Sequence, residues 1–296
     1  MQHDLSIVIV NWNTCSLLRD CLASIYSKPS VVSFEVFVVD NNSTDGSADM
    51  VAAEFPQVNL IKNNENLGYG RANNIGIRAA KAENILLLNS DTVVDPNVFT
   101  ETLHILRNNS EIGVLGCKLI GLDGDIQDSY NIQYPFGPTV DGHELSAGLI
   151  ECALVWGAYF LIKREVIEEV GAFDEDIFMF YEDVDFCWRI HDAGWKIVYD
   201  SNHSIKHISR ASCSKTANLE YNINLFVSER IMFKKRLPHS TYGKWWRKRF
   251  FYHVRCISLY FFLSHISKSP NSQELFKIHL AGCRVLLSQF PGSPAV

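Results

Sequence analysis

Leu5-Ser-Ile-Val-Ile-Val-Asn-Trp-Asn13 is an apolar run that ends in polar residues, and this combination recurs along the first third of the chain. Similar runs occupy 34–40, 58–62 and 85–88, and each is nearly continuous in apolar residues, as expected of strands covered on both faces. Stretches with helical spacing alternate with these runs at 15–27, 47–55, 70–81 and 97–108. The alternation predicts an α/β fold with a mainly parallel central sheet.

The rest of the chain is less regular. We expect strands at 113–120, 152–162 and 196–199, and helices at 164–170 and 183–193 that end at Gly171 and Gly194. The polar stretch 122–143 is expected to be a long surface loop, and loops of that length are often functional. After about residue 217 only helices are expected. The sequence thus predicts a first domain at 1–216 and a helical C-terminal extension at 217–296.

The composition is that of a folded protein with an uneven charge distribution. Of 296 residues 47% are apolar and 20% charged, which excludes a disordered chain. The formal charge of −6 combines 15 Lys/Arg and 32 acids in 1–229 with 12 Lys/Arg and one acid from Arg230 onward. The eight cysteines form no C-x-x-C pair, so we expect buried free thiols. Because 1–4 lacks the basic start of a signal peptide, we expect a cytoplasmic location.

Polar residues follow each of the first four predicted strands. They are Asn11-Trp-Asn13, Asp40-Asn-Asn-Ser-Thr-Asp-Gly46, Asn63-Asn-Glu-Asn-Leu-Gly68 and Asn89-Ser-Asp91. Each segment alone is explained by turn formation, but ligands bind at the carboxyl ends of parallel strands, and four such ends together favour a shared site. There is no G-x-G-x-x-G, P-loop or G-x-S-x-G motif. The acids and amides present suit nucleoside binding and one hard divalent metal ion.

In this order, the motifs resemble those of the family 2 glycosyltransferases, which have the GT-A fold, and most of all a bacterial rhamnosyltransferase-like subgroup. The matching segments lie within about residues 4–215. They are Ile9-Val-Asn-Trp-Asn13, Val39-Asp-Asn-Asn-Ser-Thr-Asp-Gly46, Asn66-Leu-Gly-Tyr-Gly70, Leu87-Leu-Asn-Ser-Asp91, Gly157-Ala-Tyr-Phe-Leu-Ile-Lys-Arg164, Gly171-Ala-Phe-Asp174 and Phe180-Tyr-Glu-Asp-Val-Asp-Phe186.

The resemblance implies a role for each matching position on the donor side. Asn11 and Asp40 would contact the nucleotide, with Asp40 at the pyrimidine edge, and the donor would also be lined by Asn66, Gly68, Asn73 and Ser90. Asp91 would be the main acid that binds Mg²⁺ or Mn²⁺ on the diphosphate, and His207 would complete the metal site. The family has an acid where this chain has Asn89, so Asp91 would bear more of the metal binding. A turn-forming role for Asp91 is the simpler alternative.

On the acceptor side, the resemblance implies that Asp183 is the general base of an inverting transfer, with Glu182, Trp156 and Gly157 near the acceptor. The simpler alternative is that these acids only favour a helix N-terminus. The expected donor is dTDP-L-rhamnose and the expected acceptor a lipid-linked or cell-surface glycan, with UDP-hexoses and UDP-amino sugars as alternatives. A sugar-nucleotidyltransferase and a non-catalytic sugar-nucleotide-binding protein are alternatives of another class.

The C-terminal region is basic and aromatic. Arg230–Gln273 contains no acid, and 234–266 interleaves Lys and Arg with Trp, Phe and Tyr. This pattern is typical of an interfacial helix, so we expect peripheral binding to the anionic inner face of the cell membrane. The stretch 250–266 is too short and too interrupted by His and Arg to span a bilayer. Simple packing against the first domain is the alternative, and a nucleic-acid partner is not expected.

Overall fold

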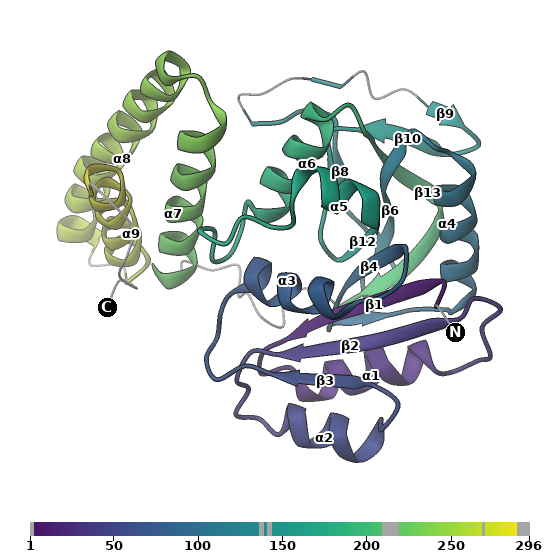
Figure 1. The fold of residues 1–296 in the computed structure, drawn as a ribbon. Coiled ribbons are helices and arrows are strands. Elements are labelled where there is room, and N and C mark those ends of the chain that lie inside the picture. The colour runs from purple at the N-terminus through teal and green to yellow at the C-terminus, as the bar shows by residue number, and fades with distance from the viewer. Residues whose placement is uncertain (1–2, 136–138, 141–143, 209–218, 268–269, 289–296) are drawn as a thin grey trace. The chain divides into compact units, whose positions relative to one another are not determined.

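The computed structural model describes residues 3–135, 139–140, 144–208, 219–267 and 270–288 (Figure 1). The chain divides into two compact units. The first, called the α/β unit here, comprises 1–175 and 182–212, and the second, called the helical unit, comprises 176–181 and 213–296. The domain boundary expected between 216 and 217 lies outside the described residues, as does Cys213. The other seven cysteines are free, as expected, and five of them are buried.

Four parallel strands form one half of the central sheet, in the spatial order β3-β2-β1-β4. They are β1 (Leu5–Asn11), β2 (Phe34–Asp40), β3 (Asn59–Lys62) and β4 (Asn84–Asn89). The parallel register pairs Asn11 with Asp40 and Val10 with Asn89. The carboxyl ends of these strands therefore meet at one edge of the sheet, which confirms the predicted α/β fold.

The other half of the sheet is mixed in direction. Its strands are β6 (Ile112–Ile120), β9 (Glu144–Ser146), β10 (Leu149–Cys152), β12 (Tyr159–Lys163) and β13 (Lys196–His207). β12 lies antiparallel between β4 and β6, and β13 runs parallel to β6. Short strands are added by β5 (Thr92–Val93), β7 (Ile126–Gln127), β8 (Tyr130–Asn131) and β11 (Leu154–Val155).

Three sequence predictions in this half were wrong. The single strand expected at 152–162 is broken into β10, β11 and β12, because the successive pieces pair with different strands, β13, β8 and β4. The strand expected at 196–199 continues to His207, since its polar second half pairs with β6 and β5. The stretch 122–143, expected to be a loop, contains β7 and β8, and 136–138 and 141–143 lie outside the described residues.

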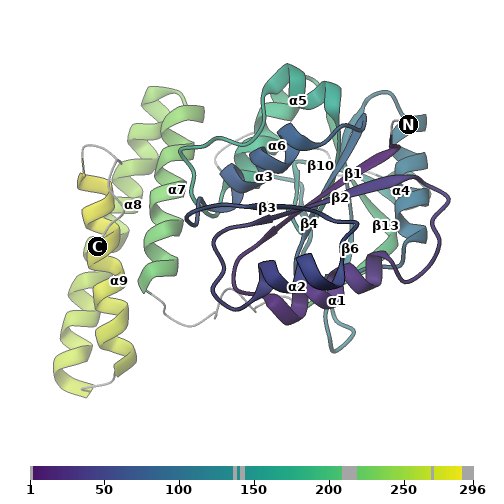
Figure 2. The ribbon, with the colours of Figure 1, turned by 60° about the horizontal axis from the view of Figure 1, so that its bottom comes forward.

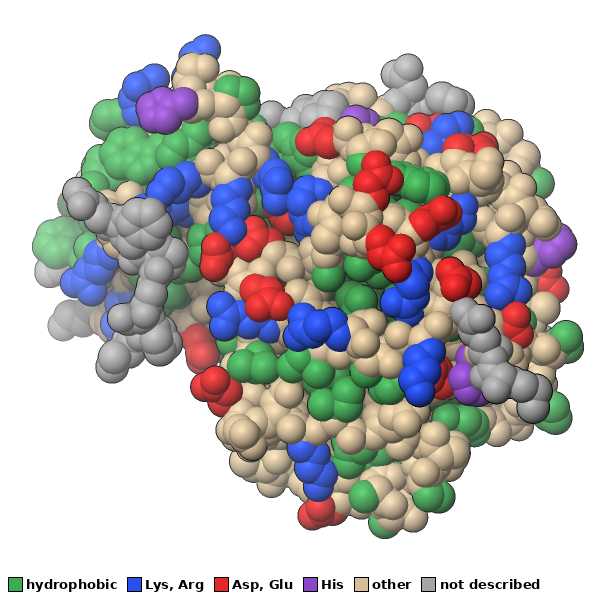
Figure 3. Space-filling model, in the orientation of Figure 1, with side chains coloured by type: hydrophobic (Ala, Val, Ile, Leu, Met, Phe, Trp, Pro, Cys, Tyr) green, Lys and Arg blue, Asp and Glu red, His purple; other side chains and the backbone are tan. Residues whose placement is uncertain are grey.

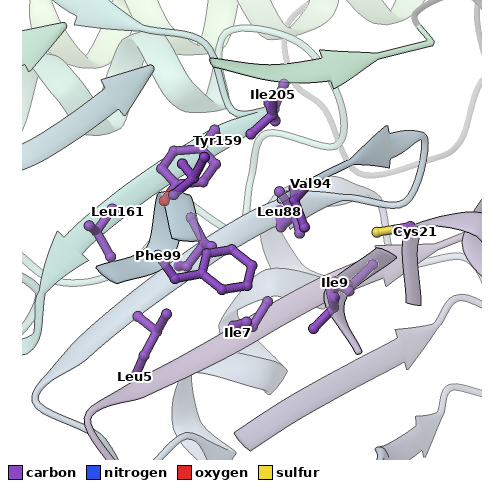
Figure 4. Close-up of a cluster of buried hydrophobic side chains, with 14 of the residues drawn as sticks. Leu5, Ile7, Ile9, Cys21, Leu88, Val94, Phe99, Tyr159, Leu161 and Ile205 are labelled. Atoms are coloured by element: carbon purple, nitrogen blue, oxygen red, sulfur yellow. The ribbon is translucent and has the colours of Figure 1, made fainter. Parts of the chain in front are cut away.

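Helices cover both faces of the sheet (Figure 2). On one face lie α1 (Cys15–Ile25), α2 (Ser47–Glu54) and α4 (Asn97–Asn108), whose apolar residues join those of the strands in one buried cluster (Figure 4). On the other lie α3 (Tyr69–Ala79), α5 (Arg164–Val170) and α6 (Glu182–Asp192). Alternate residues of β1 serve the two faces: Ile7 and Ile9 belong to the cluster, whereas Val8 lies against α3.

The helical unit consists of α7 (Leu219–Arg236), α8 (His239–Ser267) and α9 (Pro270–Leu287), as the sequence predicted. The short segment 176–181 packs within this unit, where Ser228 Oγ donates a hydrogen bond to the Met179 carbonyl over 2.7 Å. The buried Glu229 carboxylate forms an ion pair with Arg249 at 2.9 Å, which joins α7 to α8. Aromatic rings fill the remaining interface, with Phe233 against Trp245 at 5.0 Å.

Gly76 allows α3 to approach β1 closely, which yields a stability prediction. A Cβ atom at this position would lie 2.3 Å from Val8 Cγ1. We expect Gly76→Ala to lower the free energy of unfolding by about 1–2 kcal/mol, since overpacking costs more than the gain in helix propensity. Urea unfolding measures this change. Gly243→Ala is the control, because nothing lies within 4 Å of that Cβ position in α8. Equal destabilisation by both variants would contradict the close approach.

Candidate active site

Asn11 and Asp40 form a buried hydrogen-bonded pair where β1 and β2 end. Asn11 Nδ2 donates to Asp40 Oδ1 over 2.9 Å and to Ser43 Oγ over 3.1 Å. The second carboxylate oxygen, Asp40 Oδ2, accepts from the Ser43 backbone N–H over 2.9 Å. Each carboxylate oxygen can accept a further hydrogen bond, so Asp40 keeps capacity for the N–H of a ligand. The structure therefore brings together these two predicted donor-side residues.

Thr14 connects this corner to the end of β4. Its hydroxyl donates to Asn11 Oδ1 over 2.6 Å and lies 3.0 Å from the Ser90 hydroxyl. Two residues in this region, Asn13 and Asn42, have left-handed backbones with φ of 54° and 61°, which asparagine tolerates better than most residues. The sequence analysis included Ser43 in the polar segment after the second strand without giving it a role, and it missed Thr14. The only signal for them was that each follows a strand closely.

The turn before α3 is joined to the same edge. Asn41 Nδ2 donates to the Gly68 carbonyl over 3.1 Å, and Asn66 Oδ1 accepts from the Gly68 N–H over 3.0 Å. Gly68 has φ of 82°, a conformation that favours glycine at this turn. Asn73 is buried and bonds the Tyr69 carbonyl within its own helix over 3.1 Å. Its predicted role toward a donor stays a prediction.

Asp91 and His207 meet because β5 pairs with the end of β13, with Thr92 opposite His207. His207 Nε2 lies 3.4 Å from Asp91 Oδ1, and both side chains are largely buried. Over the described residues, no group of three or more His, Cys, Asp or Glu side chains is arranged to hold a metal ion. An oxygen and an imidazole nitrogen nevertheless suit Mn²⁺, with phosphate oxygens and water as further ligands. The donor set thus fits the predicted metal site.

Glu182 and Asp183 begin α6 as adjacent acids, of which Glu182 is buried and Asp183 is partly exposed. Burial raises the pKa of Asp183 to about 6, even though the backbone N–H groups of Val184 and Gly157 stabilise its charged form. Burial and the neighbouring Asp183 raise the pKa of Glu182 to about 8, and its Oε2 atom has no hydrogen-bond partner within the part of the chain that the structure describes. The two acids are close enough to titrate as a pair. At neutral pH this arrangement favours one shared proton, held mainly by Glu182.

Tyr69 joins the metal side and the acid pair. Its hydroxyl donates to the Gly157 carbonyl over 2.9 Å, while the Gly157 N–H faces Asp183. Burial raises the pKa of the Tyr69 phenol, and the nearby carboxylates of Glu182, Asp183 and Asp91 raise it further. The three predicted acids therefore lie near enough to Tyr69 for their charges to raise the pKa of the same phenol. Tyr69 lies within the matching segment Asn66-Leu-Gly-Tyr-Gly70, but the sequence analysis assigned it no role.

Trp156 stands apart from this network. Its side chain is 39% exposed, and its backbone N–H donates to the Ser129 carbonyl over 3.0 Å. The next residue, Gly157, is confined, because a Cβ atom there would lie 3.1 Å from the Tyr69 hydroxyl. An acceptor-side role for Trp156 stays a prediction.

The mixed, mostly parallel central sheet with helices on both faces is the GT-A fold of the glycosyltransferases that are its structural neighbours. A family model described as glycosyltransferase like family 2 matches residues 3–221, and the chain belongs to this family. Both the expected fold and the expected family are thereby confirmed.

Two relatives match along most of their own length. The chain is 26% identical over 261 residues to the low-salt glycan biosynthesis hexosyltransferase Agl10 of Haloferax volcanii, covering 82% of this chain and 80% of the relative. It is 27% identical over 281 residues to the N-acetylglucosaminyl-diphospho-decaprenol L-rhamnosyltransferase of Mycobacterium tuberculosis, covering 83% and 88%.

Two solved structures share the fold. A mannosyltransferase from Pyrobaculum calidifontis in complex with GDP-Man and Mn²⁺ has a TM-score of 0.57 at 13% identity, over 96% of this chain and 86% of that one. GalNAc-T7 with UDP, GalNAc and Mn²⁺ has a TM-score of 0.64 at 16% identity, over 97% and 56%. Separately, none of the helices in the described part of the chain has the length and apolarity needed to cross a membrane.

The raised pKa of Glu182 predicts a pH-dependent cost to stability. The folded protein holds this proton up to about pH 8, whereas the unfolded chain releases it in the ordinary glutamate range. The free energy of unfolding therefore falls as the pH rises between these two values. We expect Glu182→Gln to raise the free energy of unfolding at pH 8 by at least ~1.4 kcal/mol, the equivalent of one pKa unit, and by much less at pH 5. Thermal unfolding at the two pH values measures the difference.

The control for this comparison is Glu168→Gln, which removes an exposed acid from α5 and is expected to match the wild type at both pH values. A Glu182→Gln variant whose stability relative to the wild type is the same at pH 5 and pH 8 would show that Glu182 is not protonated in the native state.

Proposed function

We propose that the protein is a metal-dependent inverting glycosyltransferase. It would transfer L-rhamnose from dTDP-L-rhamnose to a hydroxyl group of a lipid-linked or cell-surface polysaccharide intermediate. The observation that carries this proposal is the pair of adjacent acids Glu182 and Asp183, whose charges, like that of Asp91, lie near enough to Tyr69 to raise the pKa of its phenol. A base and a diphosphate-binding acid are thus held near one another, which a transfer between two bound substrates requires.

The donor nucleotide would lie along the carboxyl edge of β1 and β2. Asp40 would accept the N–H of the pyrimidine ring through its remaining lone pairs, with Asn11 fixing the carboxylate. Asn66 and Gly68 would border the donor at the start of α3, and Ser90 would face the diphosphate beside Asp91. Asn73 would support this wall from within α3.

Asp91 and His207 would hold Mg²⁺ or Mn²⁺. When bound, such an ion neutralises the negative charge that grows on the departing diphosphate. The Mn²⁺ bound in two structural neighbours supports this assignment. The proposed pair supplies two ligands, which is enough for an ion that is also coordinated by substrate phosphates and water.

Asp183 would act as the general base from the acceptor side, near Trp156, Gly157 and Glu182. It takes the proton of the acceptor hydroxyl while that oxygen forms a bond to the anomeric carbon. The bond from this carbon to the diphosphate oxygen breaks, and the nucleoside diphosphate leaves with the electron pair. In-line displacement inverts the anomeric centre. A base with a pKa of about 6 is well matched to this task near neutral pH.

The rhamnosyl donor is supported by the mycobacterial relative, whose name specifies L-rhamnosyl transfer to a decaprenol-linked sugar. A UDP-hexose or UDP-amino sugar is the alternative, which the haloarchaeal hexosyltransferase and the UDP-bound neighbour support. Membership of the glycosyltransferase family weighs against a nucleotidyltransferase or a non-catalytic binding protein.

We expect Asp183→Asn to lower kcat by at least ~10²-fold while donor binding is retained, because only the proton acceptor is lost. Nucleotide release with dTDP-L-rhamnose or UDP-GlcNAc and Mn²⁺ measures turnover, and thermal shift with the same compounds measures binding. Wild-type activity should rise with pH through about 6. Asp192→Asn, at the exposed end of α6, is the control. Turnover by Asp183→Asn close to that of the wild type would refute the base assignment.

We further propose that the helical unit binds the anionic inner face of the cell membrane through 234–266. The outer face of α8 presents Phe251, Arg255, Leu259 and Phe262, all exposed and three or four residues apart. Lys244, Arg247 and Lys248 are exposed in the preceding turns, and α8 contains no acid. Hydrophobic and basic side chains lie side by side on this unit (Figure 3). Basic residues beside exposed aromatic rings complement anionic lipid headgroups.

We expect the full chain to float with phosphatidylglycerol vesicles at low salt and not with phosphatidylcholine vesicles. The double substitution Phe251→Ser and Phe262→Ser should weaken flotation by about tenfold or more, as each ring loses its burial in the interface. Val31→Ser, which alters an apolar residue that is 91% exposed in the α/β unit, is the control. Absence of flotation at low salt would refute the proposal, as would a change of oligomeric state in the double variant without a change in flotation.

A further inference from the structure

We propose that Gln127 is a positioning residue for His207, which sets the protonated nitrogen of its ring and directs Nε2 toward Asp91. The inference rests on the metal site in the proposed function. Gln127 lies in β7, in a stretch for which the sequence indicated only a loop. Its side chain forms two hydrogen bonds with the same residue, His207, which is 80 positions away in the chain.

The two bonds determine the orientation of the Gln127 amide. Gln127 Nε2 donates to the His207 carbonyl oxygen over 3.0 Å. A carbonyl oxygen can only accept, so the atom that faces it must be the amide nitrogen. The other amide atom, Oε1, lies 2.8 Å from His207 Nδ1. Because Oε1 is also only an acceptor, Nδ1 must carry the proton of this hydrogen bond.

This assignment decides what the other ring nitrogen can do. In a neutral imidazole, a proton on Nδ1 leaves the lone pair on Nε2. His207 Nε2 lies 3.4 Å from Asp91 Oδ1, so a nitrogen lone pair and a carboxylate face each other. Two acceptors this close are stabilised by a cation that both can bind. Gln127 thereby prepares one nitrogen and one oxygen as adjacent ligands.

The position of Gln127 is itself fixed by a tight hairpin. β7 pairs antiparallel with β6, with Gln127 opposite Leu119. The turn is closed by the Gly121 N–H, which donates to the Asp125 carbonyl over 2.8 Å, and Gly124 adopts φ of 81°. A Cβ atom on Gly121 would lie 3.1 Å from Gln127 Nε2. The hairpin therefore holds the amide in place before any ligand binds.

Without Gln127, Asp91 would be the remaining hydrogen-bond partner of the His207 ring among the described residues. A neutral ring would then favour a proton on Nε2, which donates to the carboxylate, and this form cannot bind a metal ion through Nε2. Residues that orient metal-binding histidines in this way typically change metal affinity by about 10–100-fold. We expect a loss of Mn²⁺ affinity in that range for Gln127→Ala.

The first test reads the ring directly and needs no metal ion or substrate. Nitrogen-15 NMR of histidine-labelled full chain at pH 8.5 distinguishes protonated from unprotonated ring nitrogens, with His207→Gln identifying the signal. We expect a proton on Nδ1 and none on Nε2 in the wild type. Gln127→Ala should move the proton to Nε2. A wild-type ring protonated on Nε2, alone or together with Nδ1, would overturn the inference.

The second test measures Mn²⁺ affinity by electron paramagnetic resonance of the free ion, alone and with dTDP or UDP. Gln127→Glu keeps an acceptor for Nδ1–H and is expected to bind Mn²⁺ within a few-fold of the wild type, unlike Gln127→Ala. Ile126→Ala, on the exposed side of β7, is the control for disturbance of the hairpin. Equal losses in all three variants would show that Gln127 is merely structural.

The two tests separate this inference from the proposed function. A wild-type protein with the expected Nδ1 proton that binds no Mn²⁺ in any mixture would refute the metal site and leave the role of Gln127 in orienting His207. A protein that binds Mn²⁺ equally well with and without Gln127 would refute the positioning role and leave the metal site.

Discussion

The parallel register of β1 against β2 and β4 is the constraint on which the site depends. It pairs Asn11 with Asp40, and Val10 with Asn89. The polar carboxyl ends of the three strands therefore lie side by side at one edge of the sheet. A shift of one residue would turn every side chain of β1 to the opposite face, moving Ile7 and Ile9 out of the buried cluster. The apolar core therefore fixes the register, and the register places the donor-side residues.

The antiparallel strand β12 brings the second half of the site to this edge. It enters the sheet beside β4, where the Asn89 N–H donates to the Ala158 carbonyl over 3.2 Å. Gly157 is thereby held next to the β4 turn that carries Asp91. From there its carbonyl and N–H reach Tyr69 and Asp183 respectively. One backbone residue thus connects α3, α6 and the edge of the sheet.

The sequence was sufficient where a function depends on local pattern. Asn11 and Asp40 end β1 and β2, and Asp91 lies two residues after β4, so the strand pattern placed all three at one edge of the sheet. Their predicted roles, and that of Asp183, came from the family resemblance. Three other features depend on contacts between distant segments. Thr14 meets Ser90 across 76 residues, and Gln127 meets His207 across 80. The division of 152–162 into three strands likewise depends on which neighbours each piece finds in the sheet.

The two acids at the start of α6 have different surroundings, and these surroundings determine which acid ionises first. Burial alone raises the pKa of either acid, but it does not decide which one ionises first. Here the Gly157 and Val184 N–H groups stabilise the charge on Asp183, whereas Glu182 Oε2 finds no hydrogen-bond partner among the described residues. Glu182 therefore keeps its proton, and the single negative charge stays on Asp183. Because a neutral neighbour adds no second charge, Asp183 remains ionised near neutral pH in spite of its burial. The destabilising group is thus Glu182, and the ionised group is Asp183, which we propose as the general base.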